Sequence, residues 1–216
     1  METKSLFGFC LALFIFLEGS LMARAQELIQ LPPPNMTGGK PLMEVLKDRH
    51  SSREFSTEKL PMQVMSDMLW AAFGINRPDL GKRTAPSAMN WQEVDIYVAT
   101  ADGLYLYDAD ACALQPILKE DIRAKTGKQD FVAQAPVNLI YVADFSKMGD
   151  SSDDDKRLYS AADVGFICEN VYLFCASEGL ATVVRGMVDR EELAKTMNLR
   201  PEQKVILAQT VGYPKK

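Results

Sequence analysis

Five consecutive residues, Arg49-His50-Ser51-Ser52-Arg53, form the densest group of anion-binding side chains in the sequence. Arg49 and Arg53 are four residues apart, a spacing that places two side chains on the same side of either a helix or a strand. A guanidinium presents paired planar donors that match phosphate oxygens, and the two serines add hydroxyl groups. The segment therefore predicts a binding site for a small anion. The alternative interpretation is a solvated basic turn.

Composition and charge restrict the kind of partner. The 216 residues are 47% hydrophobic and 25% charged, which is ordinary for one globular domain with a hydrophobic core. The formal net charge of −5 argues against nucleic acid as a partner, because proteins that bind it usually carry a concentrated basic face. His50 is the only histidine and no CxxC pair occurs, so we expect no metal site.

The first residues have the pattern of an export signal. Lys4 supplies a positive charge, residues 7–17 are apolar, and Ala23-Arg24-Ala25 matches a small-x-small cleavage site. An apolar run of that length is shorter than the roughly 20 residues that a membrane span needs. We expect residues 1–25 to be removed and the protein to be exported, to the periplasm in a bacterial cell. An uncleaved membrane anchor is the alternative, and only then would the protein contact a membrane.

Proline and glycine punctuate the segment after the signal. Residues 26–40 contain Pro32-Pro33-Pro34 and Gly38-Gly39, so we expect a linker there, with the ordered domain occupying residues 41–216. Of the cysteines beyond the signal, Cys168 and Cys175 are seven apart on a predicted helix, about 10 Å along its axis. That separation is too large for a disulfide, and we interpret both as packing residues.

Helical and strand patterns are mixed along the chain. Apolar spacing and breaker residues predict helices at 41–47, 61–73, 117–125, 157–178 and 189–197. They predict strands at 94–100, 104–107, 137–143, 180–184 and 205–211. The acidic run at 150–155 is interpreted as a solvated loop, although its carboxylates also suit the start of a helix. Hairpin and crossover signals occur together, so the expected fold class is α+β.

Several separated motifs follow one another along the chain. They are Arg49-His50-Ser51-Ser52-Arg53, then Ala85-Pro86-Ser87-Ala88-Met89-Asn90-Trp91-Gln92, then residues 170–186 ending in Arg185-Gly186, and finally Gly212-Tyr213-Pro214. In this order and spacing, the chain from about Pro41 onward resembles the nitroreductase family of FMN-dependent oxidoreductases. A looser likeness, carried by residues 103–108, is to the azoline-forming peptide dehydrogenases.

The resemblance implies a fold, a cofactor and an assembly. The fold is an α+β sandwich with a central, mainly antiparallel sheet flanked by helices. The assembly is an intertwined homodimer with FMN at the subunit interface. The predicted helix at 157–178 is similar to the one around which such dimers pack, which would explain why it is apolar on both flanks.

The resemblance also assigns cofactor-binding residues. Those assigned to the phosphate and ribityl chain of FMN are Arg49, His50, Ser51 and Arg53. Ser87 and Asn90 are assigned to the flavin ring. The backbone amides around Arg185 and Gly186 are assigned to its N5 atom, and Lys215 is assigned to the phosphate. Judged on residue type alone, Asn90 can equally cap a loop, the Arg185–Gly186 pair can be a simple turn, and Lys215 can belong to a frayed tail.

One departure from the family pattern concerns charge. Many relatives have an apolar residue where this chain has Arg185, so we expect a charge beside the substrate face that could select an anionic electron donor or acceptor.

The implied activity is a two-step electron transfer through FMN. A donor reduces the flavin at N5 and leaves, and an electron-poor acceptor such as a nitro compound or quinone then takes the electrons. No catalytic side chain is assigned, because the chemistry belongs to the cofactor. Two alternatives stay open: a secreted flavin-binding or interaction module without turnover, and an azoline-type dehydrogenase.

Overall fold

The computed structural model describes residues 27–216, and the predicted export signal at 1–25 lies outside them. The elements in chain order are β1 (Ile29–Gln30), α1 (Leu42–Asp48), α2 (Met62–Phe73), β2 (Ile75–Arg77), β3 (Lys82–Arg83), β4 (Val94–Thr100), β5 (Gly103–Asp108), β6 (Ala113–Leu118), β7 (Val137–Asp144), α3 (Asp153–Glu178), β8 (Ala181–Arg185), α4 (Arg190–Thr196) and β9 (Gln203–Gly212). Within this part of the chain, no helix is long and apolar enough to cross a membrane.

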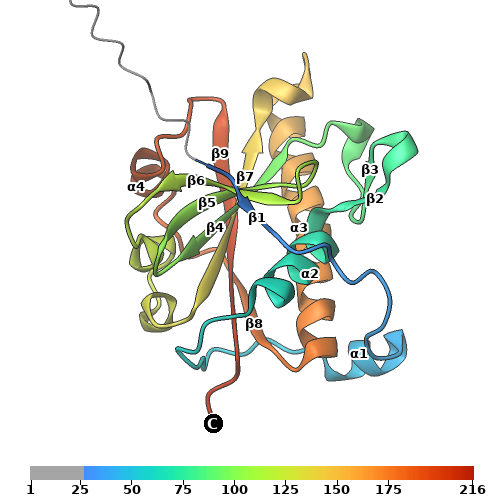
Figure 1. Ribbon diagram of the computed structural model, residues 1–216. Coiled ribbons are helices and arrows are strands. Elements are labelled where there is room, and N and C mark those ends of the chain that lie inside the picture. The colour runs from blue at the N-terminus through green and yellow to red at the C-terminus, as the bar shows by residue number, and fades with distance from the viewer. Residues whose placement is uncertain (1–26) are drawn as a thin grey trace, which may run out of the picture.

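A seven-stranded antiparallel sheet forms the centre of the molecule (Figure 1), in the order β1-β6-β5-β4-β7-β9-β8. Successive side chains of a strand point to opposite faces, and β4 divides accordingly. Ile96 and Val98 pack in the cluster that contains α2 and α3, whereas Tyr97 and Ala99 pack in the cluster that contains α4. The predicted α+β fold, with an antiparallel sheet flanked by helices, is confirmed.

The longest helix, α3, begins and ends at recognisable caps. The Ser152 hydroxyl accepts a hydrogen bond from the Asp155 amide, and three aspartates occupy the first turn, where the helix dipole favours negative charge. The second half of the acidic run is therefore helical rather than a loop. Gly179 ends the helix in the left-handed conformation. Cys168 and Cys175 are buried and free, as expected of packing residues.

Residues 117–125 do not form the predicted helix. They contain the end of β6 and a 3₁₀ turn at Arg123–Thr126. Pro116 lies inside β6, opposite Tyr105, next to an irregularity in the register with β5. In sequence-based prediction, a proline inside a strand-like run argues against a strand. Here β6 accommodates Pro116 next to the irregularity in its register with β5.

Residues 27–40 are tied to the domain, contrary to the expected linker. Ile29 and Gln30 pair with β6 and cover its edge. The Leu31 side chain is buried, and the Asn35 amide donates to Asp67 Oδ1 at 2.7 Å. Ordered structure therefore begins well before Pro41.

Candidate functional site

The end of α1 delivers the arginine-rich segment to α3. The Arg49 amide donates to the Val45 carbonyl at the end of α1, and the Arg49 guanidinium lies 5.3 Å from the centre of the Tyr172 ring. Such a stacked guanidinium retains its outward-facing donors. The Ser51 hydroxyl lies 2.8 Å from the Tyr172 hydroxyl. Tyr172, which sequence reasoning did not identify, therefore contacts two of the predicted ligands.

The same segment lies along the outer edge of β8. The Ser52 amide donates to the Thr182 carbonyl at 2.9 Å, and the Tyr172 hydroxyl accepts from the Val184 amide at 2.9 Å. β8 is the last strand of the sheet, so this edge has no neighbouring strand. The strand leads directly to Gly186. The predicted phosphate ligands and the predicted N5 turn thus lie along one strand edge.

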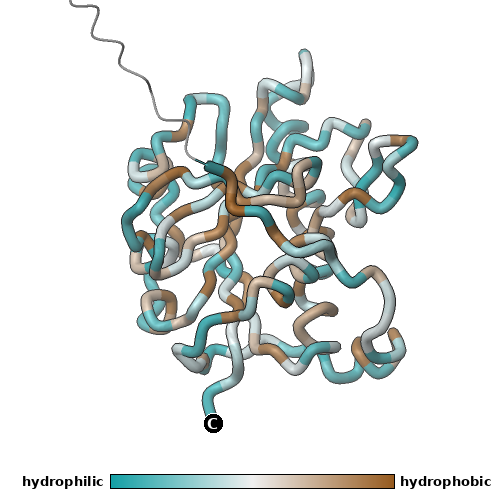
Figure 2. The backbone as a smooth tube through the Cα atoms, in the orientation of Figure 1, coloured by the Kyte–Doolittle hydropathy of each residue, from teal (hydrophilic) through white to brown (hydrophobic). Residues whose placement is uncertain are grey.

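The C-terminal residues return to this segment. The Ser56 amide donates to the Tyr213 carbonyl, Phe55 bridges Pro214, and the Lys215 amide donates to the Glu54 carbonyl at 3.3 Å. The end of the chain is hydrophilic (Figure 2). The backbone of Lys215 is therefore held by Glu54, the residue after Arg53, rather than in a frayed tail.

We call Arg49, His50, Ser51, Arg53 and Lys215 the β8-edge cluster. Within residues 27–216, no salt bridge engages its arginines or its lysine. His50 is exposed, and its Nδ1 lies 2.8 Å from the Asp48 carbonyl oxygen. Cations without a carboxylate partner, next to a hydroxyl, suit an anion with several oxygens.

Arg185 does not place a charge beside a substrate. Its side chain is 3% exposed, and its guanidinium donates to Thr126, Asn138 and Thr210 at distances between 2.6 and 3.3 Å. Burial lowers its pKa to about 10, so it stays charged at neutral pH. The expectation that this charge selects substrates is wrong, because the strand directs the side chain into the protein.

A glycine makes room for the buried guanidinium. A Cβ atom on Gly127 would overlap Arg185 Nη1, although the backbone of Gly127 is extended and accessible to any residue. Gly186, by contrast, has open space, since an added Cβ would meet only Leu207 at 3.8 Å. The turn after β8 therefore has room beside its backbone at Gly186.

The loop carrying Ser87 and Asn90 has a strained backbone. Met89, Asn90 and Gln92 all have positive φ, at 49°, 57° and 47°. Non-glycine residues adopt this conformation rarely, and such residues persist where the surroundings over-determine them. The Ser87 hydroxyl accepts from the Gln92 amide at 2.9 Å and donates to Glu93 Oε2 at 3.2 Å.

Two buried carboxyl groups hold this loop. Glu93 is fully buried and Asp163 is 3% exposed, and Asp163 Oδ2 accepts from the Ala88 amide at 2.8 Å. Within residues 27–216, Glu93 Oε1 has no hydrogen-bond partner. Burial, and then the neighbouring Asp163, raise the pKa of Glu93, and burial raises the pKa of Asp163. The pair thus favours holding a proton.

This pair gives the folding stability a definite pH dependence. Because both pKa values are higher in the folded chain than in the unfolded chain, the folded state holds more protons once the pH exceeds about 4. The stability contributed by the pair therefore falls as the pH rises through the folded pKa values. We expect Glu93→Gln to raise the melting temperature by several degrees at about pH 8 and to flatten its decline from about pH 5.

Thermal unfolding followed by circular dichroism at constant ionic strength measures this effect. The control is Glu120→Gln, which removes an exposed carboxylate. Equal pH slopes in the parent and Glu93→Gln would show that other groups govern the pH dependence.

The two groups of predicted ligands lie on opposite sides of α3. Ala88 contacts Asp163, whereas Ser51 contacts Tyr172, nine residues further along the helix. Nine residues correspond to two and a half turns and about 13 Å along the axis. A single chain therefore does not bring Ser87 and Asn90 to the β8-edge cluster.

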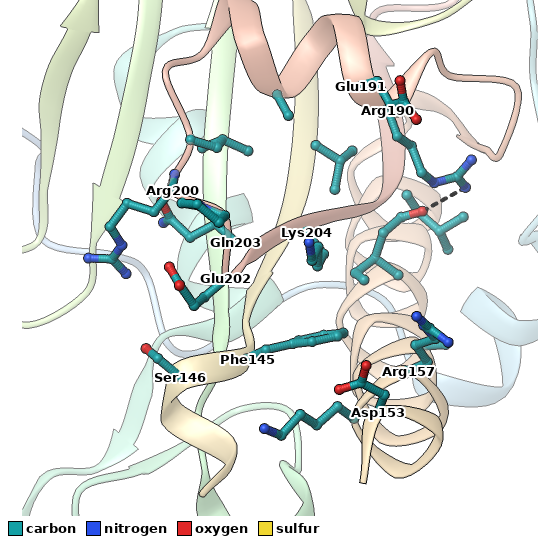
Figure 3. Close-up of a pocket in the computed structure, with 18 of the residues that line it drawn as sticks. Phe145, Ser146, Asp153, Arg157, Arg190, Glu191, Arg200, Glu202, Gln203 and Lys204 are labelled. Atoms are coloured by element: carbon teal, nitrogen blue, oxygen red, sulfur yellow. Dashed lines mark hydrogen bonds between the residues drawn. The ribbon is translucent and has the colours of Figure 1, made fainter. Parts of the chain in front are cut away.

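A large cavity on another side of the molecule contains none of the predicted ligands. It is a groove of about 1500 Å³ between the first half of α3, α4 and the start of β9. Figure 3 shows Arg190 reaching across it to the Ile206 carbonyl at 2.9 Å, with Arg157 and Lys204 nearby. Because β8 ends opposite Ala208, the preceding residues of β9 have a free edge here. Leu207 places the groove next to Gly186.

Comparison with known proteins identifies the family. The chain matches the sequence profile of the Nitroreductase family over residues 46–213, a range that contains all the predicted ligands except Lys215. The chain belongs to the nitroreductase family. It is therefore an oxidoreductase, and it shares with that family the fold described above.

Individual relatives cover most of this nitroreductase. A candidate nitroreductase of Methanocaldococcus jannaschii is 31% identical over 169 residues, covering 74% of this chain and 85% of the relative. The crystal structure of a candidate nitroreductase from Ralstonia eutropha JMP134 has 42% identity and a TM-score of 0.85, covering 89% and 92% of the two chains. An NADPH:FMN oxidoreductase from Vibrio harveyi, complexed with NAD+, shares the fold at a TM-score of 0.61 and 20% identity, covering 81% and 69%.

Proposed function

We propose that this nitroreductase binds FMN along the outer edge of β8 and passes electrons from a reduced donor to an electron-poor acceptor such as a nitro compound or quinone. One observation carries the proposal. The β8-edge cluster, with its cations free of carboxylate partners, lies on the same strand edge that ends at the Arg185–Gly186 turn.

The residues present fit a flavin mononucleotide. Arg49 and Arg53 would hold the phosphate with Lys215, and the Ser51 hydroxyl would contact the ribityl chain. Backbone amides near Arg185 and the open space at Gly186 would receive the ring. When bound, FMN supplies an N5 atom that accepts and returns a hydride. The likeness in fold to the NADPH:FMN oxidoreductase of Vibrio harveyi supports the same cofactor.

The protein's contribution is position and electrostatic field. The cluster orients the cofactor, and the turn after β8 offers backbone donors that do not titrate. The Arg185 guanidinium adds a fixed positive charge behind that turn, because it is buried and has no carboxylate partner among residues 27–216. Such a charge favours electron density arriving on the ring.

We further propose a homodimer that completes each site. The face of α3 opposite its buried stripe exposes small and apolar residues, namely Leu158, Ala162, Gly165 and Phe166. Exposed apolar stripes of this kind mark interaction surfaces. A second copy packed on this face would bring its own Ser87–Asn90 loop toward the β8-edge cluster, which one chain alone does not do.

The test is spectroscopic and kinetic. We expect the purified protein reconstituted with FMN to show a flavin spectrum with one FMN per chain, to be reduced by a nicotinamide or another biological donor, and to be reoxidised by a nitro compound or quinone. A protein bleached by dithionite but by no biological donor would be a flavin-binding module instead. A colourless chain that binds no FMN in excess would refute the proposal, and oxidation of a peptide-bound thiazoline would indicate the azoline chemistry.

A further inference from the structure

A small hairpin next to the Ser87–Asn90 loop concentrates positive charge. β2 and β3 pair antiparallel, with Arg77 directly opposite Lys82 and Ile75 opposite Arg83. Like charges directly opposite each other in a sheet destabilise the pairing. Within residues 27–216, none of the three cations takes part in a salt bridge. The hairpin therefore carries a net positive charge, with three cations against one carboxylate, Asp79, in its connecting turn.

These cations share a cavity with the predicted ring contacts. The cavity has a volume of about 230 Å³ and is lined by Arg77, Lys82, Arg83, Ala85, Pro86, Ser87, Asn90 and Gln92. No aspartate or glutamate is among the lining residues. The chain as a whole has a net charge of −5, so this positive site runs against the overall charge. Dissolved salt screens the charge of this positive cavity, so the cavity attracts anions only over about one Debye length.

Hydrogen bonds fix one of the three cations and leave the others adaptable. Arg83 donates to Gln92 Oε1 at 2.6 Å and to the Phe73 carbonyl at 3.0 Å, and its guanidinium lies 4.8 Å from the centre of the Phe73 ring. Arg77 reaches only the neighbouring Asn76 side chain and the Arg83 carbonyl. Lys82 forms no ion pair in the described chain and is half-buried at the cavity.

We propose that this cavity binds the anionic group of a substrate, a phosphate, sulfonate or carboxylate, while the rest of that substrate lies over the flavin. The proposal rests on the proposed function, because Ser87 and Asn90 link the cavity to the ring. It places the selective charge on Arg77 and Lys82, since Arg185 is buried. The anion belongs either to the donor, as in the ribose phosphate of NADPH, or to the acceptor.

Charge-removing variants test the cavity. The Arg77→Gln/Lys82→Gln variant removes two positive charges from the cavity. The control, Lys59→Gln/Lys119→Gln, removes two positive charges at the other end of the sheet. There Lys59 pairs with Asp102 at an exposed turn. With FMN in saturating excess to fill the β8-edge cluster, titration calorimetry at low salt measures the binding of inorganic pyrophosphate. We expect about tenfold weaker binding in the cavity variant alone, a loss of about 1.4 kcal/mol shared by two solvent-accessible cations.

Steady-state kinetics identify the source of the anion. We compare kcat/KM for NADPH with that for NADH, and for a sulfonated naphthoquinone with that for its neutral parent. We expect the cavity variant to lower one of these ratios about tenfold, with the member of the pair that lacks the additional anionic group unaffected. The same ratios and the same pyrophosphate affinity in both variants would overturn the proposal. Absence of turnover with every substrate would refute the proposed function, and the pyrophosphate titration would then decide the cavity separately.

Discussion

Alanine at both Arg49 and Arg53 is expected to lower the affinity for FMN at least 100-fold. Both guanidiniums lack carboxylate partners within residues 27–216, so an anion would be their principal counter-charge. A hydrogen bond to a charged group contributes about 1.5–3 kcal/mol, and two losses together correspond to a factor of 100 or more. Fluorescence titration of FMN against the purified variant measures the change, and gel filtration shows whether flavin stays bound.

The matched control for this variant is Lys59→Ala/Lys119→Ala, which makes the same change in net charge away from β8. Its FMN affinity should equal that of the parent, and the melting temperatures of all three apoproteins should agree, because the arginines are exposed or half-buried. If Arg49→Ala/Arg53→Ala still binds FMN with the parent's affinity, the β8-edge cluster does not hold the phosphate.

The second large effect concerns assembly. Glutamate at both Leu158 and Phe166 is expected to convert the protein from dimer to monomer and to remove most bound FMN. These side chains are 63% and 50% exposed in a single chain, so the substitutions cost little within the monomer. In the proposed dimer they would bury unpaired carboxylates against their own copies. Light scattering coupled to gel filtration reports the mass, and absorbance in the same run reports the flavin.

The control places the same charges on other exposed apolar residues. Leu28→Glu/Met36→Glu changes side chains near β1, at the opposite end of the sheet from β8. It should leave the mass and the flavin content unchanged. A monomeric Leu158→Glu/Phe166→Glu protein that retains a full complement of FMN would contradict a site built from two chains.

Local signals were sufficient to predict most helices. Pro61 precedes α2 and Gly74 follows it, and Gly179 ends α3, each at the position that the sequence indicated. β6 was missed because Pro116 is a strand breaker by its own chemistry, and only the pairing with β5 shows that the register tolerates it. β1 was missed for a related reason. A two-residue strand beside three prolines has no periodicity of its own and is defined by the edge that it covers.

The candidate site was predictable only in part. The four-residue interval between Arg49 and Arg53 predicted a shared anion site on the premise of a helix or a strand, whereas residues 49–53 form neither, so the shared anion stays a prediction. Contacts between distant residues were not predictable. Nothing near Tyr172 in the sequence indicates that its hydroxyl joins Ser51 to the Val184 amide. The binding of FMN by any of these residues stays a prediction.

Burial of ionisable groups was equally hidden. Strand alternation leaves two directions open for Arg185, and the choice depends on three polar groups from other strands and turns that converge on its guanidinium. Glu93 precedes a strand as an ordinary polar boundary residue would, yet it is enclosed with Asp163 from a helix seventy residues later. Sequence patterns report the periodicity of one element, and these groups depend on several.

The close fit between Arg185 and Gly127 has an evolutionary consequence. Any side chain at position 127 would occupy the space of the guanidinium, which is held by hydrogen bonds and is not free to move aside. A descendant that keeps Arg185 must therefore keep glycine at position 127, although the extended backbone there is accessible to any residue. Once a short apolar residue replaces Arg185, position 127 no longer has to be glycine. We therefore expect substitutions at positions 127 and 185 to be correlated.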